Sequence, residues 1–346
     1  MMLEVTTRLI ELASNENPFG PSPKALAAMQ AALSYSHLYP DDQASELQKQ
    51  LADHHTIRAE QVLIGAGSTE VINIIARTLL RPGLKAVASE RSFIVYSIAT
   101  SMAGGQLVQV PMREGGFDLD AIAAAVDGDT RVIFLANPNN PTGTIFSADA
   151  ADKFLSRIPE DVVVVLDEAY YEYASFFAAE RGFRYSHSPK YLREKSNVVV
   201  LRTFSKVHGL AGLRVGYALG PAGLLPRFAK MRSTYSVCVP AQAGAVAALE
   251  DKAHVQQCIA ANASGAQWLG EQLSELGFHP TRTWANFIYC DIGQDADEFS
   301  QRMAVQGVLI RPLGPWGAPN SIRVSIGTPQ QNQAFAAAFR KVAGKN

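Results

Sequence analysis

Before residue 240, short apolar runs alternate along the chain with longer segments in which apolar and polar residues mix. Most of the runs are continuous in apolar residues, which is typical of parallel strands that helices cover on both faces. They predict strands at 62–64, 86–88, 107–110, 132–135, 162–166, 198–201 and 215–218. Helices are expected at 23–33, 44–54 and 69–80, the first with Ser22 as its N-cap ahead of a proline. The pattern predicts an α/β domain with a mostly parallel sheet covered by helices.

After residue 240 the pattern changes to two helices followed by a mixture of strands and helices. We expect helices at 241–249 and 253–276, a strand at 286–290, a helix at 296–305, strands at 308–311 and 322–325, and a helix at 331–342. This order predicts a smaller α+β domain with its own sheet. We therefore divide the chain into a segment 1–35 that packs with the small domain, a large domain 36–240 and a small domain 241–346. Ligands favour the cleft between two such domains.

Composition narrows the class of protein without identifying it. The chain has 346 residues, of which 47% are hydrophobic and 18% charged, so it can bury a substantial core. Its net charge of −1 and the absence of a basic block argue against nucleic acid or a membrane surface as a partner. We recognise no signal peptide near the N-terminus and no apolar run long enough to span a membrane. A cytoplasmic enzyme is expected.

The three cysteines give no sign of a metal site or of a disulfide framework. Cys238, Cys258 and Cys290 lie far apart and lack the spacing of metal ligands. Their surroundings are apolar or helical, so we expect buried free thiols, as in proteins of a reducing compartment.

Lys206 is the most informative residue of the chain. It follows the apolar run 198–201, so it lies near the end of a predicted strand, where open α/β sheets place their ligands. A lysine amine can form a Schiff base with a carbonyl compound, and the nearby Ser205 and Arg214 suit a phosphate. Together they indicate pyridoxal phosphate, which is both an aldehyde and a phosphate ester. On this segment alone, a solvated lysine at a strand end remains the alternative.

Two further strand ends carry polar side chains. Asp167 ends a run of four valines and a leucine, and burial of its carboxylate there requires a cation or a strong donor. A protonated pyridine nitrogen is such a partner, and a helix N-cap is the alternative. Asn140 lies in the turn 136–143, from which its amide could donate to a phenolic oxygen on a ring; the alternative is an ordinary turn.

The segment 65–70, rich in small residues, joins a predicted strand to a predicted helix. Small residues let backbone amides approach a phosphate at a helix N-terminus, where the helix dipole favours an anion. Taken alone this signal is weak, because most such loops are only tight turns. The segment has neither the spacing of a dinucleotide fingerprint nor that of a P-loop.

In this order, these motifs resemble the fold-type I pyridoxal phosphate enzymes, specifically the class I/II aminotransferases, and within them the histidinol-phosphate aminotransferase family. The resemblance covers nearly the whole chain and includes the segments 13–23, 39–40, 307–312 and 322–329. It implies a large cofactor-binding domain with a mostly parallel sheet and a smaller α+β C-terminal domain.

The resemblance implies a role for each cofactor residue. Lys206 would form the Schiff base and shuttle the proton, and Asp167 would pair with the ring nitrogen. Asn140 and Tyr170 would hold the ring oxygen, while Phe93 would stack on the ring. The residues that would hold the phosphate are Ala66, Gly67 and Ser68 through their amides, Thr203, Ser205 and Arg214, together with Tyr39 from the partner subunit of a homodimer.

The resemblance also implies that Arg323, Arg311 and Asn15 bind the substrate, Arg323 in a bidentate fork and Arg311 at a substrate phosphate. The implied reaction moves an amino group between histidinol phosphate, or an aromatic amino acid, and 2-oxoglutarate by a ping-pong mechanism, as in histidine biosynthesis. The alternative is a lyase of the same fold, such as a decarboxylase of a phosphorylated amino acid. A regulator of this fold is disfavoured, because such proteins carry an N-terminal DNA-binding segment.

Two features depart from the family's pattern. The Pro-Tyr-x-Pro-Gly segment usual near the family's N-terminus is not found, which leaves the substrate open. The long stretch 171–197 is either a flap at the site or a surface feature. His208 is expected to pack near Lys206 and not to act in catalysis, and Glu168 is expected to face the opposite side of its strand from Asp167.

Overall fold

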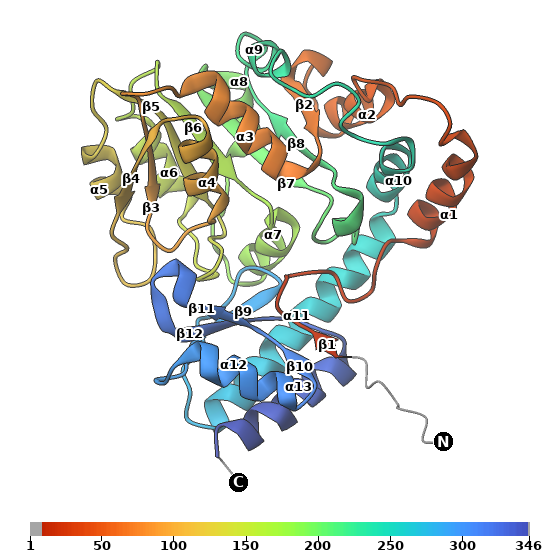
Figure 1. Ribbon diagram of the computed structural model, residues 1–346. Helices are drawn as coiled ribbons and strands as arrows, with labels where there is room; N and C mark the ends of the chain where they lie inside the picture. Colours follow the sequence, from red (N-terminus) through yellow and green to blue (C-terminus); the bar gives the residue numbers. More distant parts are fainter. Residues whose placement is uncertain (1–8, 345–346) are drawn as a thin grey trace.

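A seven-stranded sheet forms the centre of the computed structural model, which describes residues 9–344 (Figure 1). Strand β8 is antiparallel to both of its neighbours, and the other pairs are parallel. All the strands predicted before residue 240 are present, which confirms a mostly parallel sheet. In their order across the sheet they are β2 (Val62–Gly65), β8 (Gly216–Leu219), β7 (Val198–Thr203), β6 (Val163–Asp167), β5 (Thr130–Ala136), β3 (Lys85–Ser89) and β4 (Gln106–Val110).

Helices cover both faces of this sheet, which explains why its strands are continuous apolar runs. Val164 and Val200 pack into the cluster formed with α2, α6 and α10, whereas Val165 and Val199 pack into the cluster formed with α3, α4 and α9. The helices that precede α11 in the chain are α1 (Pro23–Ala32), α2 (Ser45–His55), α3 (Gly67–Leu79), α4 (Val95–Met102), α5 (Leu119–Ala124), α6 (Ala148–Leu155), α7 (Tyr171–Glu180), α8 (Ser188–Glu194), α9 (Leu225–Ala229) and α10 (Val239–Glu250).

The three helices predicted in this part are confirmed as α1, α2 and α3. The Ser22 hydroxyl accepts a hydrogen bond from the Ala25 amide at 3.1 Å, so Ser22 is the N-cap of α1, as predicted. Helices α4 to α9 were not predicted. They contain between 5 and 10 residues each, too few turns for a helical period to stand out in the sequence.

The C-terminal part has its own antiparallel sheet, β11 (Arg311–Leu313), β12 (Ala318–Ser325) and β9 (Phe287–Asp291), in that order. The predicted strand 308–311 is divided, because β10 (Val308–Leu309) pairs with β1 (Ile10–Glu11) and only β11 joins β12. The helices are α11 (Lys252–Glu275), α12 (Ala296–Val305) and α13 (Pro329–Val342), at the predicted places.

Two elements connect the sheets. After β1, the Leu12 carbonyl accepts from the Ser325 amide at 2.7 Å, so the N-terminal segment adds to the small sheet before α1 packs against α10. The long helix α11 contacts both α7 and α13, and Figure 1 shows it running from one part to the other. The division at residue 240 remains our interpretation, since α11 belongs to both parts.

Some expectations need correction or completion. Cys238 is exposed beside the start of α10, so the prediction that it is buried was wrong, whereas Cys258 and Cys290 are buried free thiols. The stretch 171–197 contributes α7 and α8, whose Tyr173 and Tyr191 are buried, so it is part of the packed domain and not a separate flap. No helix within residues 9–344 is long and apolar enough to cross a membrane.

Glu168 and Asp167 face opposite sides of the sheet, as predicted. The Glu168 carboxylate forms an ion pair with Arg202 at 2.8 Å, and the two side chains are 2% and 7% exposed. The Arg202 guanidinium also lies 3.3 Å from the centre of the Tyr171 ring. A carboxylate buried this deeply requires such a partner, and Glu168 is therefore part of the support beneath the strand ends.

Candidate active site

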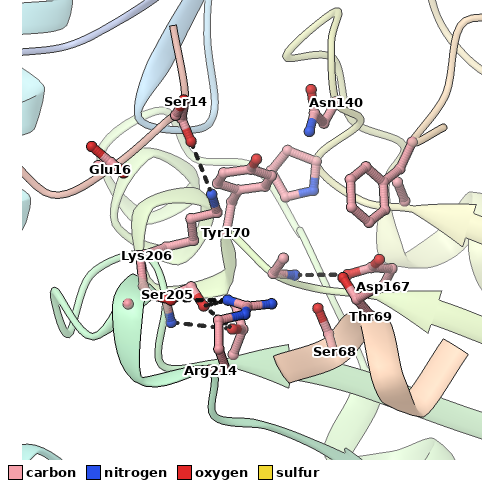
Figure 2. Close-up of a pocket in the computed structure, with 17 residues that line it drawn as sticks. Ser14, Glu16, Ser68, Thr69, Asn140, Asp167, Tyr170, Ser205, Lys206 and Arg214 are labelled. Carbon is pink, nitrogen blue, oxygen red and sulfur yellow. Dashed lines mark hydrogen bonds between the residues drawn. The ribbon is translucent and has the colours of Figure 1, made fainter. Parts of the chain in front are cut away.

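A cavity of about 350 Å³ opens at the ends of the central strands (Figure 2). Lys206, Asp167 and Asn140 reach it from β7, β6 and the loop after β5, which are neighbours in the sheet. Parallel strands end at the same edge, so side chains far apart in sequence meet there. The predicted site residues that line the cavity are Ser68, Phe93, Asn140, Asp167, Tyr170, Thr203, Ser205, Lys206 and Arg214.

The Lys206 amine points at the N-terminal segment. Its Nζ donates to the carbonyl oxygen of Asn15 at 3.2 Å and, more weakly, to that of Ser14 at 3.5 Å. Burial and then the nearby Arg323 charge lower the pKa of Lys206 to about 8. A substantial fraction of the amine is therefore neutral near physiological pH, and only a neutral amine can attack a carbonyl carbon.

The Asp167 carboxylate is buried at the end of β6, with 4% of the residue exposed. Its Oδ2 accepts from the Tyr96 hydroxyl at 2.8 Å and its Oδ1 from the Ala169 amide at 3.2 Å. Burial raises the pKa of Asp167 to about 6, and the Tyr96 hydrogen bond opposes that rise. No ion pair within residues 9–344 includes Asp167, so the carboxylate suits a cationic group of a ligand in the cavity.

Two glycines allow close packing at the start of α3, one against Arg214 and the other against the backbone of α3 itself. A Cβ at Gly67 would lie 2.4 Å from Arg214 Nη2, and one at Gly216 would lie 2.2 Å from the Ser68 nitrogen. Arg214 Nη1 also donates to Ser205 Oγ at 3.4 Å. The Ser205 hydroxyl, the Arg214 guanidinium and the start of α3 at Ser68 thus lie on one side of the cavity (Figure 2). Together with the first amides of α3, these groups form a donor set that fits a phosphate.

One predicted phosphate contact is already used within the protein. The Ala66 amide donates to Glu70 Oε2 at 2.5 Å, and Ser236 Oγ donates to the same oxygen at 2.9 Å. Neither Ala66 nor Gly67 lines the cavity, so of the three loop residues predicted to hold the phosphate only Ser68 belongs to its lining. Thr69, which was not predicted, does line it; a second hydroxyl in the first turn of α3 was the available signal.

Asn140 is oriented by an arginine. Its Oδ1 accepts from Arg323 Nη1 at 2.5 Å, so its amide nitrogen is left to donate elsewhere. Arg323 Nη2 donates to the Ala13 carbonyl at 2.6 Å, and Asn15 Nδ2 donates to the Tyr170 hydroxyl at 3.0 Å. Both contacts tie the N-terminal segment to the strand ends.

Arg323 and Arg311 are direct partners in the register of β12 and β11, so their side chains share one face of the small sheet. Arg311 Nε donates to the Ala13 carbonyl at 3.3 Å, the same oxygen that Arg323 uses. Burial lowers the pKa of Arg323 to about 10. Two guanidiniums side by side favour an anionic ligand.

The remaining predicted residues do not line the cavity. Tyr39 is 82% exposed, and its ring stacks on that of Tyr235 with 4.7 Å between centroids. His208 packs against Phe204 with 4.9 Å between ring centroids, in agreement with a packing role. Sequence reasoning also missed Ser14, Glu16, Ala136, Pro138, Ala169, Ala211 and Gly212 in the lining and Tyr96 behind Asp167.

Comparison with known proteins identifies the family. The sequence model of the family described as aminotransferase class I and II matches residues 7–339. Histidinol-phosphate aminotransferase 2 of Pseudomonas aeruginosa is 44% identical over 334 residues, which cover 96% of this chain and 89% of that protein. Histidinol-phosphate aminotransferase of Moorella thermoacetica is 41% identical over 335 residues, 96% of this chain and 85% of that one.

A solved structure gives the same result. The histidinol-phosphate aminotransferase of Sinorhizobium meliloti, in complex with pyridoxal-5'-phosphate, is 30% identical with a TM-score of 0.88, over 97% of this chain and 91% of that chain. The fold, the buried carboxylate and the donor-lined cavity thus define a fold-type I pyridoxal phosphate-dependent aminotransferase. The chain belongs to the class I and II aminotransferase family.

We expect Lys206 to be the amine that captures pyridoxal phosphate in the cofactor-free protein, and its pKa predicts how the capture rate depends on pH. Only the neutral amine reacts, so the capture rate should rise with pH and level off above about 8. Stopped-flow recording of the visible absorbance of the bound cofactor measures this rate. A free lysine side chain, the matched control, should level off only near its ordinary pKa of about 10.4; the same high value in the protein would contradict the assignment.

Proposed function

We propose that this protein transfers the amino group of histidinol phosphate to 2-oxoglutarate by a ping-pong mechanism, with Lys206 as the covalent attachment point of the cofactor and as the proton shuttle. Its relatives in Pseudomonas aeruginosa and Moorella thermoacetica carry the name of this activity. The observation that carries the proposal is the pair Arg311 and Arg323 beside the Lys206 cavity. Both substrates are anions, and a paired guanidinium site can bind each of them in turn.

Each of several residues in the cavity would contact a different part of the cofactor ring. Pyridoxal phosphate, when bound, supplies an electron sink for the carbon that loses its proton. The Asp167 carboxylate would pair with the ring nitrogen, since it is buried and forms no ion pair within the described residues. The Asn140 amide, oriented by Arg323, and the Tyr170 hydroxyl donate to the ring oxygen, and Phe93 covers the ring face.

The phosphate is at the opposite end of the cofactor, and the protein would hold this anion through hydrogen-bond donors alone. Arg214, Ser205 and the amides of Gly67 and Ser68 supply its donors, and the Thr203 hydroxyl donates to Ser205 Oγ at 3.0 Å, which orients that side chain. With the cofactor anchored at both ends, the Lys206 amine, once the substrate amine has displaced it, would take a proton from the substrate carbon and return it.

We further propose that Tyr39 reaches the cofactor phosphate of the partner subunit in a homodimer. Tyr39 lies outside its own cavity and is almost fully exposed. The same surface exposes Leu33, Tyr35, Leu38 and Tyr235, an apolar group of the kind that a second copy covers.

Mixed variants test the shared site. Tyr39→Ala and Lys206→Ala proteins are each expected to be nearly inactive, because each site lacks one of the two residues. After unfolding and refolding together in equal amounts, about a quarter of all sites should be intact, because half of the dimers are mixed and each has one native site. Lys206→Ala mixed with Asp167→Ala is the control, since both residues belong to the same subunit and no native site can form. Equal activity in the two mixtures would contradict a shared site.

Arg311→Ala tests the substrate. A charge-assisted hydrogen bond to phosphate contributes about 1.5–3 kcal/mol, so kcat/KM for histidinol phosphate should fall roughly 10- to 150-fold. Phenylalanine, which lacks a phosphate, should be nearly unaffected in the same half-reaction. Arg302→Ala is the matched control, because Arg302 is on the surface of α12 and bonds Gln294. Equal losses for both donors would show that Arg311 is structural and would remove the main support for a phosphate-bearing substrate.

The same half-reaction distinguishes the two reaction classes. Transamination leaves the amino group on the cofactor. The absorbance of the bound cofactor therefore stays changed until 2-oxoglutarate is added and restores it. A lyase returns the cofactor unchanged and has no need of 2-oxoglutarate. Full recovery of the starting absorbance without 2-oxoglutarate would therefore favour the lyase.

A further inference from the structure

Tyr96 contacts the carboxylate of Asp167 from behind the cavity. It lies in α4, 71 residues before Asp167, and its hydroxyl donates to Asp167 Oδ2 at 2.8 Å. Tyr96 is 1% exposed and does not line the cavity. It therefore cannot touch a ligand there except through Asp167.

The ring of Tyr96 is fixed on both sides. It stacks on Phe134 of β5 with 4.8 Å between centroids and 6° between planes, and it meets Phe93 edge-on at 5.7 Å. Burial and the neighbouring Asp167 charge raise the pKa of Tyr96 well above its usual value, so the hydroxyl keeps its proton and always donates. A phenylalanine would fill the same space, so packing does not explain the hydroxyl.

We propose that Tyr96 is a positioning residue that sets how strongly Asp167 holds its negative charge, and through Asp167 how firmly the cofactor ring nitrogen keeps its proton. The proposal rests on the proposed pairing of Asp167 with that nitrogen. A hydrogen bond donated to a carboxylate stabilises its charged form and makes it a weaker base. Within residues 9–344, Asp167 has one donor besides Tyr96, the Ala169 amide at 3.2 Å, so the hydroxyl is one of two donors to this carboxylate.

The other charged groups around Asp167 do not replace this hydroxyl. Glu168, the residue after it and just beyond the end of β6, raises its pKa, and Lys206 across the cavity lowers it. Tyr170 faces the site but donates no hydrogen bond to Asp167 in the described chain. Loss of the Tyr96 hydroxyl should therefore make Asp167 more basic and draw the shared proton from the ring nitrogen toward the carboxylate.

Tyr96→Phe in the holoenzyme tests this proposal. Pyridoxal phosphate labelled with ¹⁵N in the ring gives a signal that follows the position of the shared proton continuously. We expect that signal to move toward the value of an unprotonated pyridine. We also expect kcat to fall about tenfold, the equivalent of one hydrogen bond of about 1.4 kcal/mol, with little change in KM.

Two reference proteins make the result specific. Tyr191→Phe removes a buried hydroxyl that donates to Asp152 at 2.6 Å outside the cavity, so it should leave the nitrogen signal unchanged. Asp167→Asn should give the limiting, unprotonated signal. If Asp167→Asn leaves the signal in place, the proposed pairing of Asp167 fails. If Asp167→Asn moves it and Tyr96→Phe does not, only the role of Tyr96 is overturned.

A second variant covers the case in which Tyr96→Phe does not fold. Replacement of Tyr96 by 3-fluorotyrosine keeps the ring and makes the hydroxyl a stronger donor. The nitrogen signal should then move in the opposite direction, away from the value of unprotonated pyridine. An unchanged signal in this protein would overturn the proposal, because a ring that only packs would not affect the shared proton.

Discussion

Burial of the Asp167 carboxylate at the end of β6 is the constraint on which the site depends. A strand of valines places it between two helical layers, where a charge is stable only with donors and a cationic partner. The protein supplies the donors, from Tyr96 and Ala169, and we propose that the ring nitrogen of the cofactor takes the cationic position. On the other side of the strand, Glu168 obtains its cation from Arg202. Of these two adjacent carboxylates, Glu168 forms an ion pair within the protein, whereas Asp167 is available to a ligand in the cavity.

The N-terminal segment completes the site by offering its carbonyl oxygens to the cations around the cavity. Lys206 donates to the carbonyl of Asn15, while Arg311 and Arg323 share that of Ala13. The segment is itself held by β10 through β1 and by the Ser325 amide. The positions of the Lys206 amine and of the two arginines that we propose to bind substrate therefore depend on one short stretch of chain. An anionic substrate would compete with these carbonyls for the same donors.

Much of this could be predicted from the sequence, because the central strands are buried on both faces and their ends carry the chemistry. Lys206, Asp167 and Asn140 each follow a continuous apolar run, so their meeting at one edge follows from the sheet. Contacts between distant residues could not be predicted in the same way. Tyr96 reads as a core tyrosine on a short helix, and nothing near it in sequence points to Asp167. The hydrogen bond from the Ala66 amide to Glu70 joins residues only four positions apart, yet it depends on the exact path of the loop before α3.

The covalent attachment of pyridoxal phosphate to Lys206 is the central claim, and borohydride reduction tests it most directly. Reduction of the holoenzyme, followed by proteolysis and mass spectrometry, should find the cofactor on the peptide that contains Lys206 and on no other. The Lys206→Ala protein treated in the same way should carry no stable label. Cofactor fixed to another lysine, in either protein, would contradict the account.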